Sequence, residues 1–434
     1  MQHPPDSRAL MEWLKCTLKT ELALDDLLQT YDRVGRLLDL WHQLSTSDYM
    51  PEALRRQNIN LLMDMAHTCV AGGLPLGVHA VNPQANGASA RLPLSLSPAM
   101  RQANPHVLAL GLMGKGKTCL LTRMIAHDIE AADRAVVVID SAGTLIDFID
   151  NWISNHPRCD DFVERTTILD PTLESGNPVF NPLEYPDDDD VQAVASAVVS
   201  AFRGVHGETD LASNGSDWNG HTATILRNAI LLLIFSGSTL AHLPTLLLDA
   251  DYRDLLLHNL AAQKSTRTEH RTLLEIWAQY KRLADAPQWI TWIEPILTRI
   301  TPLLSDGRVL SLLNSRTSTL DLHDVICNRR ILLIKLPQAQ LDHSGDLLAA
   351  LMIASLKRAA VSLSSSDDTA LQPCTLYADE LDNLIGWEGL SSFLNEARKY
   401  QIGFTGSARS IQALPQLRRS HLLNLFGTIA AFAL

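Results

Sequence analysis

A glycine-rich turn that ends in lysine and threonine carries the clearest chemistry in the sequence. It reads Gly111-Leu112-Met113-Gly114-Lys115-Gly116-Lys117-Thr118. This spacing lets backbone N–H groups wrap phosphate oxygens, and the start of a following helix adds partial positive charge. The Lys117 ammonium is expected to reach the β- and γ-phosphates, and the Thr118 hydroxyl to ligate Mg²⁺. An apolar strand before the turn and a helix after it disfavour the alternative, a glycine-rich turn without a ligand.

Two adjacent carboxylates, Asp379 and Glu380, close an apolar run at residues 374–378. The carboxyl end of a buried parallel strand is where α/β sheets bind ligands. Asp379 is therefore expected to hold Mg²⁺ through water, and Glu380 to orient and deprotonate the attacking water. The alternative is an acidic pair that caps a helix on a surface turn.

Together these motifs predict an ATP and Mg²⁺ site with Lys117 and Glu380 as catalytic residues and Thr118 and Asp379 as metal-holding residues. The expected nucleotide contacts are Gly111, Met113, Gly114, Lys115, Gly116, Lys117, Thr118 and Cys119.

Other polar and aromatic residues have blander explanations. Asp140 follows an apolar run and is expected to cap a helix or support the site from behind. Trp218 precedes a helix and is expected to anchor packing rather than to stack on a base. No histidine has a partner at metal-ligand spacing.

The elements that must position these residues alternate between strand and helix. Apolar runs separated by helical periods predict a mostly parallel sheet with helices on both sides. Strands are expected at 107–110, 135–139, 330–336, 374–378, 402–407 and 427–434, and helices at 117–129, 347–363 and 390–400.

The domain prediction follows the same patterns. Residues 1–75 read as an N-terminal helical region, and residues 76–190 as the first part of the ATPase domain, opening with short strands between 75 and 105. Residues 191–325 have helical periods throughout, which predicts an all-helical domain inserted into the α/β domain. Residues 326–434 complete the ATPase domain.

Bulk properties favour a globular protein of the cytoplasm. The 434 residues exceed one ordinary domain, and the 6 cysteines include no C-x-x-C pair, which argues against a disulfide framework and a structural zinc site. No secretory signal precedes the first helix. The most membrane-like stretch, residues 229–248, is broken by polar residues and a proline, which predicts a buried helix and a loop.

The overall net charge of -12 argues against a nucleic-acid partner, because a DNA-binding surface must be locally cationic. Acidic runs such as residues 187–190 account for part of this charge. A ring that holds DNA in a narrow pore needs basic residues only at its pore loops, so DNA stays among the expected partners.

Several segments in order resemble the type IV coupling proteins of bacterial conjugation and secretion, within the FtsK-like and HerA-like DNA pumps. They lie at 106–118, 136–145, 168–171, 180–183, 331–337, 374–380 and 396–403. The resemblance covers roughly residues 100–434. It implies a RecA-like P-loop NTPase, an inserted helical domain, and hexameric rings around DNA. In such rings an arginine acts on the neighbour's ATP; the matching position is Arg398, whose alternative role is a surface salt bridge.

The sequence departs from this family at three places. Relatives usually begin with transmembrane helices, whereas the first hundred residues here show none, so membrane attachment is expected through a partner or not at all. Where the family usually has a γ-phosphate-sensing glutamine, this chain has Arg409, which is expected to contact phosphate itself or to alter coupling. The chain stops at Leu434, where relatives continue.

Three functions remain open from the sequence. The first is an ATP-driven DNA translocase or substrate receptor beside a relaxase or secretion channel. The second is a HerA-like ATPase that works with a nuclease or effector. The third is a module that binds ATP without turning it over.

Overall fold

The computed structural model describes the greater part of the chain in two compact units. The described residues are 74–81, 90–96, 98–185, 191–205, 218–263, 268–283, 287–341, 344–365, 371–380, 387–410 and 419–432. Apart from its last two residues, the helical region predicted for 1–75 lies outside them, as do residues 187–190. One unit comprises Met1–Asn104 with Ala126–Asp128, and the other Pro105–Ile125 with Ile129–Leu434.

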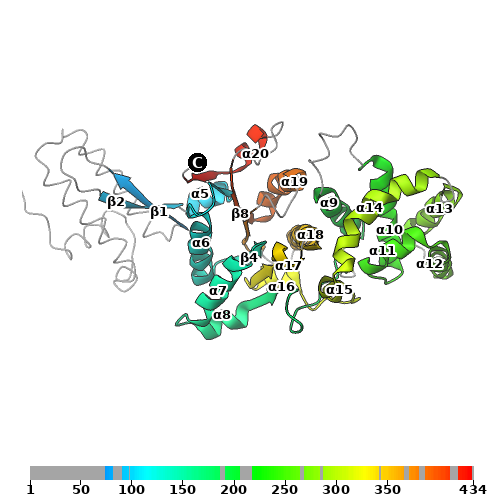
Figure 1. The fold of residues 1–434 in the computed structure, drawn as a ribbon, viewed down its shortest axis with the longest axis horizontal. Helices are drawn as coiled ribbons and strands as arrows, with labels where there is room; N and C mark the ends of the chain where they lie inside the picture. The colour runs from blue at the N-terminus through cyan, green and yellow to red at the C-terminus, as the bar shows by residue number, and fades with distance from the viewer. Residues whose placement is uncertain are drawn as a thin grey trace, which may run out of the picture. The chain divides into compact units, whose positions relative to one another are not determined.

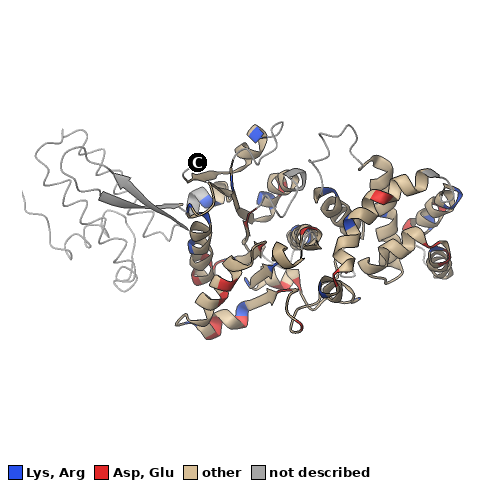
Figure 2. Ribbon diagram, in the orientation of Figure 1, with Lys and Arg blue, Asp and Glu red and all other residues tan. Residues whose placement is uncertain are grey.

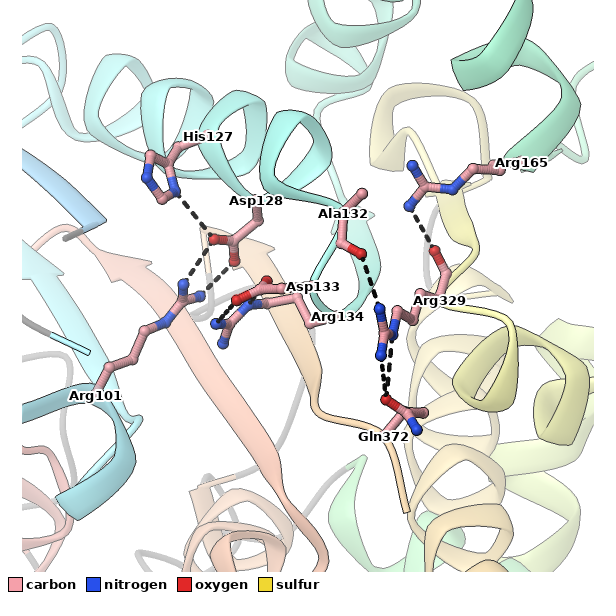
Figure 3. Close-up of polar contacts among 9 residues, drawn as sticks. All are labelled: Arg101, His127, Asp128, Ala132, Asp133, Arg134, Arg165, Arg329 and Gln372. Carbon is pink, nitrogen blue, oxygen red and sulfur yellow. Dashed lines mark hydrogen bonds and ion pairs between the residues drawn. The ribbon is translucent and has the colours of Figure 1, made fainter. Parts of the chain in front are cut away.

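The first unit contains a hairpin and a short helix. The predicted short strands are β1 (Leu74–Val81) and β2 (Ala90–Leu96), which pair antiparallel. The expectation of strands rather than helices is wrong for α5 (Pro98–Ala103). On this helix Arg101 Nη1 donates to Asp128 Oδ1 at 2.6 Å, and its Nη2 pairs with the other carboxylate oxygen, as Figure 3 shows. Both residues are buried, so this two-pronged ion pair holds a charge that would be costly alone.

The second unit is built on a parallel seven-stranded sheet of order β5-β6-β4-β7-β8-β3-β9. All its described strand pairs are parallel. The strands are β3 (Val107–Leu110), β4 (Ala135–Asp140), β5 (Thr166–Leu169), β6 (Ile331–Lys335), β7 (Cys374–Asp379), β8 (Ile402–Ala408) and β9 (Thr428–Ala431). Five match predicted runs closely; β9 is shorter than predicted, and β5 was missed because it is short and only its last residue is buried.

Helices cover both faces of this sheet, as apolar strands require (Figure 1). Right-handed crossovers place connections that run in opposite directions along the sheet on opposite faces. One set is α6 (Lys117–Ala131), α7 (Thr144–Ser154) and α8 (Cys159–Arg165). The other is α16 (Leu322–Cys327), α17 (Gln338–Leu341), α18 (Ser344–Ser365), α19 (Trp387–Ala397) and α20 (Arg419–Leu425). The neighbours β3 and β8 therefore lead to opposite faces, and a crevice opens at their carboxyl ends.

Between β5 and β6 the described elements after residue 190 are all helical. They are α9 (Val191–Gly204), α10 (Gly220–Phe235), η2 (Leu240–His242), α11 (Leu243–Leu248), α12 (Ala250–Ala262), α13 (Thr268–Leu283), α14 (Pro287–Ser305), α15 (Gly307–Leu313) and α16. Helices α9 and α14 pack on α18, and the segment shares one hydrophobic core with the sheet. In this core Trp218 packs under the Arg299 guanidinium, 4.9 Å from its ring centroid. Trp218 is thus a packing residue; the boundaries of a separate inserted domain stay a prediction.

Among the described helices, α18 is long and apolar enough to cross a membrane. About two thirds of its most apolar stretch is buried inside the protein, as in the core helix of a globular domain. The sequence pointed instead to residues 229–248, which form the end of α10 and α11. Burial against α9 and α14 explains the apolar composition of α18.

Polar contacts tie the loops together at the amino-terminal edge of the sheet (Figure 3). The Arg329 side chain, just before β6, donates to Gln372 Oε1 at 2.8 Å and reaches the Ala132 carbonyl at 3.5 Å. Arg165, at the end of α8, donates to the Arg329 carbonyl at 2.7 Å. These bonds connect the loops that enter β4, β5, β6 and β7. This edge is opposite to the one where the glycine-rich turn begins.

A buried histidine stands at the entrance to β3. His106 is 2% exposed, and its Nε2 lies 3.1 Å from the Leu394 carbonyl of α19, to which it must donate because a carbonyl only accepts. The pKa of His106 falls from 6.5 to about 4, chiefly because the imidazole is buried. The hydrogen bond to Leu394 opposes this fall, and the nearby Arg398 charge adds to it. The folded protein therefore holds this imidazole neutral where the unfolded chain would protonate it.

We expect His106 to make the fold sensitive to mild acid. Between pH 6.5 and about 4 the unfolded state binds the extra proton, so the unfolding free energy falls as the pH falls through this window. The loss approaches about 3 kcal/mol, since one pKa unit is worth about 1.4 kcal/mol. Denaturant titrations of wild type and His106→Gln from pH 4 to 8 measure it. Equal pH dependence in both proteins would contradict the assignment.

Candidate functional site

The glycine-rich turn joins the end of β3 to the start of α6, as the sequence predicted. Gly114 and Gly116 have φ of 72° and 101°, conformations that other residues rarely adopt. The turn is exposed, with Met113 71% accessible, so its backbone N–H groups can face a ligand. Lys117 is buried and its Nζ donates to the Leu112 carbonyl at 3.1 Å, which folds the ammonium back over the turn. This geometry fits a phosphate cradle.

A hydrogen bond joins this turn to the predicted acidic pair. The Thr118 hydroxyl donates to Asp379 Oδ2 at 2.7 Å, although 261 positions separate the two residues. Asp379 ends β7, and β8 lies between β7 and β3 in the sheet. A threonine hydroxyl and a carboxylate oxygen in contact form the oxygen-rich setting that Mg²⁺ prefers. The two residues predicted to hold the metal are therefore brought together.

The side chain of Ser407 lies near the end of β8, the strand between β7 and β3. Its hydroxyl donates to Asp379 Oδ1, and the Glu380 backbone N–H donates to its oxygen at 3.0 Å. Ser407 is fully buried. The sequence analysis missed this residue. A serine at the end of an otherwise apolar strand was the available signal, but it becomes informative only when the strand order is known.

Glu380 follows directly and has a positive φ of 52°, uncommon outside glycine. Its N–H also points to Asp379 Oδ1 at 3.1 Å. The Arg409 guanidinium lies 3.4 Å from Glu380 Oε2, so the arginine that replaces the expected glutamine contacts the expected base. Both side chains are partly exposed, at 46% for Arg409 and 26% for Glu380, so solvent screens the pair.

Asp140 lies at the same level of the sheet as Asp379, but it caps a helix. It is the register partner of Asp379 on β4, and its carboxylate accepts backbone N–H bonds from Ala142, Leu145 and Ile146 at 2.8 to 3.1 Å. These bonds cap the start of α7. Burial raises the pKa of Asp140 above its usual value, while the backbone N–H bonds oppose that rise. The capping role expected from the sequence is confirmed by these contacts.

Arg398 does not join the other predicted residues. It opens the short helix η4 (Arg398–Tyr400) just before β8, at the amino-terminal edge of the sheet, and it is exposed. Lys117 and Glu380 follow the carboxyl ends of their strands. The chain's own site is therefore out of reach of Arg398 across the length of β8.

A cavity of about 430 Å³ lies apart from these residues, between α9, α18 and α19. Alanines of α9 and α18 and serines of α9 form much of its wall, and none of residues 111–119, Asp379 or Glu380 lines it. Its lining is mostly apolar, and the Lys357 ammonium in it pairs with Glu396, which makes this cavity a poorer candidate for a triphosphate than the carboxyl edge of the sheet.

Comparison with known proteins supports the resemblance seen in the sequence. Residues 90–290 match the family described as type IV secretion-system coupling protein DNA-binding domain. This segment includes the glycine-rich turn and most of the helices between β5 and β6. No curated protein sequence matches the chain.

Solved structures are similar to this chain at low identity. Plasmid coupling protein TrwB in complex with ADP and Mg²⁺ is 17% identical, with a TM-score of 0.50 over 76% of this chain and 71% of that chain. TrwB with a non-hydrolysable ATP analogue is 21% identical, with a TM-score of 0.48 over 76% and 71%. VirB4 of Thermoanaerobacter pseudethanolicus is 13% identical, with a TM-score of 0.44 over 82% and 83%. The first of these establishes a RecA-like P-loop α/β fold.

Two aspartates at one level of the sheet allow a matched test. We expect Asp379→Asn to weaken Mg²⁺-dependent ATP binding about 10- to 100-fold, as loss of a residue that holds a metal through water does. Asp140→Asn should leave that affinity within about twofold but lower the unfolding free energy by about 1 to 3 kcal/mol, because capping bonds are lost. Calorimetric titration and denaturant unfolding measure both. Equal losses of ATP affinity in the two variants would contradict the separation of roles.

Proposed function

We propose that this chain, whose residues 90–290 match the type IV coupling-protein family, is an ATP-hydrolysing DNA translocase or substrate receptor of a conjugation or type IV secretion system. The observation that carries the proposal is the Thr118–Asp379 hydrogen bond, which places the glycine-rich turn, the metal-holding residues and Glu380 at one edge of the sheet. The TrwB structure with ADP and Mg²⁺ supports these ligands for the site.

The residues divide the work of hydrolysis. Backbone N–H groups of residues 111–119 and the Lys117 ammonium bind the phosphates, and Thr118 with Asp379 positions Mg²⁺. The metal supplies charge neutralisation of the phosphate oxygens. Glu380 orients water and takes its proton, with its backbone fixed by Ser407. When a triphosphate is bound, Arg409 leaves its ion pair with Glu380 and contacts the γ-phosphate instead. The Glu380 carboxylate is then free to act on water.

Arg398 completes the site of a neighbouring subunit. Its place at the amino-terminal edge supports this, because in a ring one subunit's edge can face the next subunit's nucleotide. A cation supplied in this way is worth about 10³ to 10⁵ in rate. The proposed assembly is a homohexameric ring in the cytoplasm, attached to the inner membrane through a partner.

DNA contact is proposed to be local. Figure 2 shows acidic and basic residues interspersed along the drawn ribbon, and the net charge is -12. A phosphate backbone binds where lysines and arginines gather, so a few loops of the ring would supply the contact. The family match favours this function over a nuclease-linked HerA-like ATPase.

We expect ATP hydrolysis to rise several-fold on addition of DNA. Lys117→Ala should abolish hydrolysis by removing phosphate binding, and Glu380→Gln should lower the turnover rate about 10²- to 10⁴-fold by removing the base while ATP binding is retained. Phosphate release with and without single- or double-stranded DNA measures these effects. Turnover that no form of DNA changes would sink the translocase proposal, and absent turnover with tight ATP binding would favour a non-hydrolysing module.

The role of Arg398 can be tested by mixing variants. Arg398→Ala and Glu380→Gln subunits, each inactive alone, should regain activity in mixed rings, with on the order of a quarter of the interfaces complete. The matched control is a mixture of Lys117→Ala and Glu380→Gln, whose defects fall in one site and cannot complement each other. A first mixture that stays as inactive as the control mixture would contradict action between subunits.

A further inference from the structure

The strand order gives a bound triphosphate a direction. Glu380 and Arg409 follow β7 and β8, which lie on one side of β3, while β9 lies on the other side. A general base acts within about 3 Å of its water, so the γ-phosphate must point toward β8 and β7. The α-phosphate and the nucleoside then leave the turn toward β9. This step rests on the proposed function.

Phe432, directly after β9, is the residue that meets the turn on that side. Its backbone N–H donates to the Leu110 carbonyl at 2.7 Å, which continues the pairing of β9 with β3. A Cβ added to Gly111 would lie 2.7 Å from the Cβ of Phe432, too close for any side chain. A Cβ at Gly116 would lie 3.6 Å from the phenyl ring. The backbone and Cβ of Phe432 therefore lie against Gly111, and its phenyl ring lies near Gly116.

The ring is placed where it can also meet a ligand. Phe432 is only partly buried, so part of its surface stays accessible beside a turn that is itself exposed. Cys119, in the first turn of α6, is exposed too. An aromatic ring at the edge of a phosphate site offers a flat apolar face on which a base can stack, and such stacking is tolerant of base identity.

We propose that Phe432 is the nucleobase-binding surface of this site and that it takes purine bases by stacking. Gly111 is required because it lets Phe432 approach the turn. The phosphate cradle and the base platform are thus in direct contact, on the side of β3 away from the acids. Adenine and guanine nucleotides bind with similar affinity through the ring, since a phenyl group has no hydrogen-bonding atom to tell them apart.

The test compares ligands with and without a base. Calorimetric titrations of the full chain with Mg²⁺ and ADP, GDP or inorganic tripolyphosphate are made for wild type, Phe432→Ala and Phe432→Trp. Phe432→Ala should weaken ADP and GDP about tenfold, the effect of removing a stacking residue, and change tripolyphosphate less than about twofold. Phe432→Trp keeps an aromatic face and should retain ADP binding.

Two results with Phe432→Ala would overturn the proposal. Equal weakening of tripolyphosphate and ADP in Phe432→Ala would mean that the ring only shapes the turn. Unchanged ADP binding would mean that the base lies elsewhere. If Phe432→Ala does not fold, Phe432→Leu, which keeps apolar packing without an aromatic face, takes its place. Wild-type protein that binds none of the three ligands would instead refute the nucleotide site itself.

Discussion

One hydrogen bond, from the Thr118 hydroxyl to the Asp379 carboxylate, defines the site on which the function depends. It joins segments separated by 261 positions, and it can form only because β8 brings β3 and β7 to within one strand of each other. Ser407 on β8 holds the other oxygen of Asp379 and the Glu380 backbone. The glycine-rich turn, the pair Thr118 and Asp379, and the proposed general base Glu380 are thereby fixed relative to one edge of the sheet.

The two edges of the sheet carry different sets of residues. The carboxyl edge holds the residues proposed to bind the nucleotide, while the amino edge holds Arg398 and the loop contacts of Arg329. A residue that serves a neighbour has to lie away from its own site, so the separation of Arg398 from Glu380 is what a ring mechanism requires. His106 connects the start of β3 to α19, the helix that precedes Arg398, which makes the packing of this edge sensitive to protonation.

Motifs with short spacing were predictable from the sequence, and contacts between distant strands were not. The turn at 111–118, the strand ending at Asp379 and the helical run after residue 190 were read from local pattern and confirmed. Strand β5 was missed because it is short and only its last residue is buried, and helix α5 was missed because it is short and lies among turn-forming residues. Ser407 and Phe432 have no motif of their own. Their roles follow from strand order, which places Ser407 between the acids and the turn and Phe432 on the opposite side.

The most direct test of one shared nucleotide site is a cryo-electron microscopy map of the Glu380→Gln variant with Mg²⁺ and ATP. If the sheet edge is the site, the map will show the phosphates within the 111–118 turn, the metal between the Thr118 hydroxyl and the phosphates, and Asp379 beside it. A nucleotide bound elsewhere, with Thr118 still donating to Asp379 as it does in the present structure, would contradict that assignment.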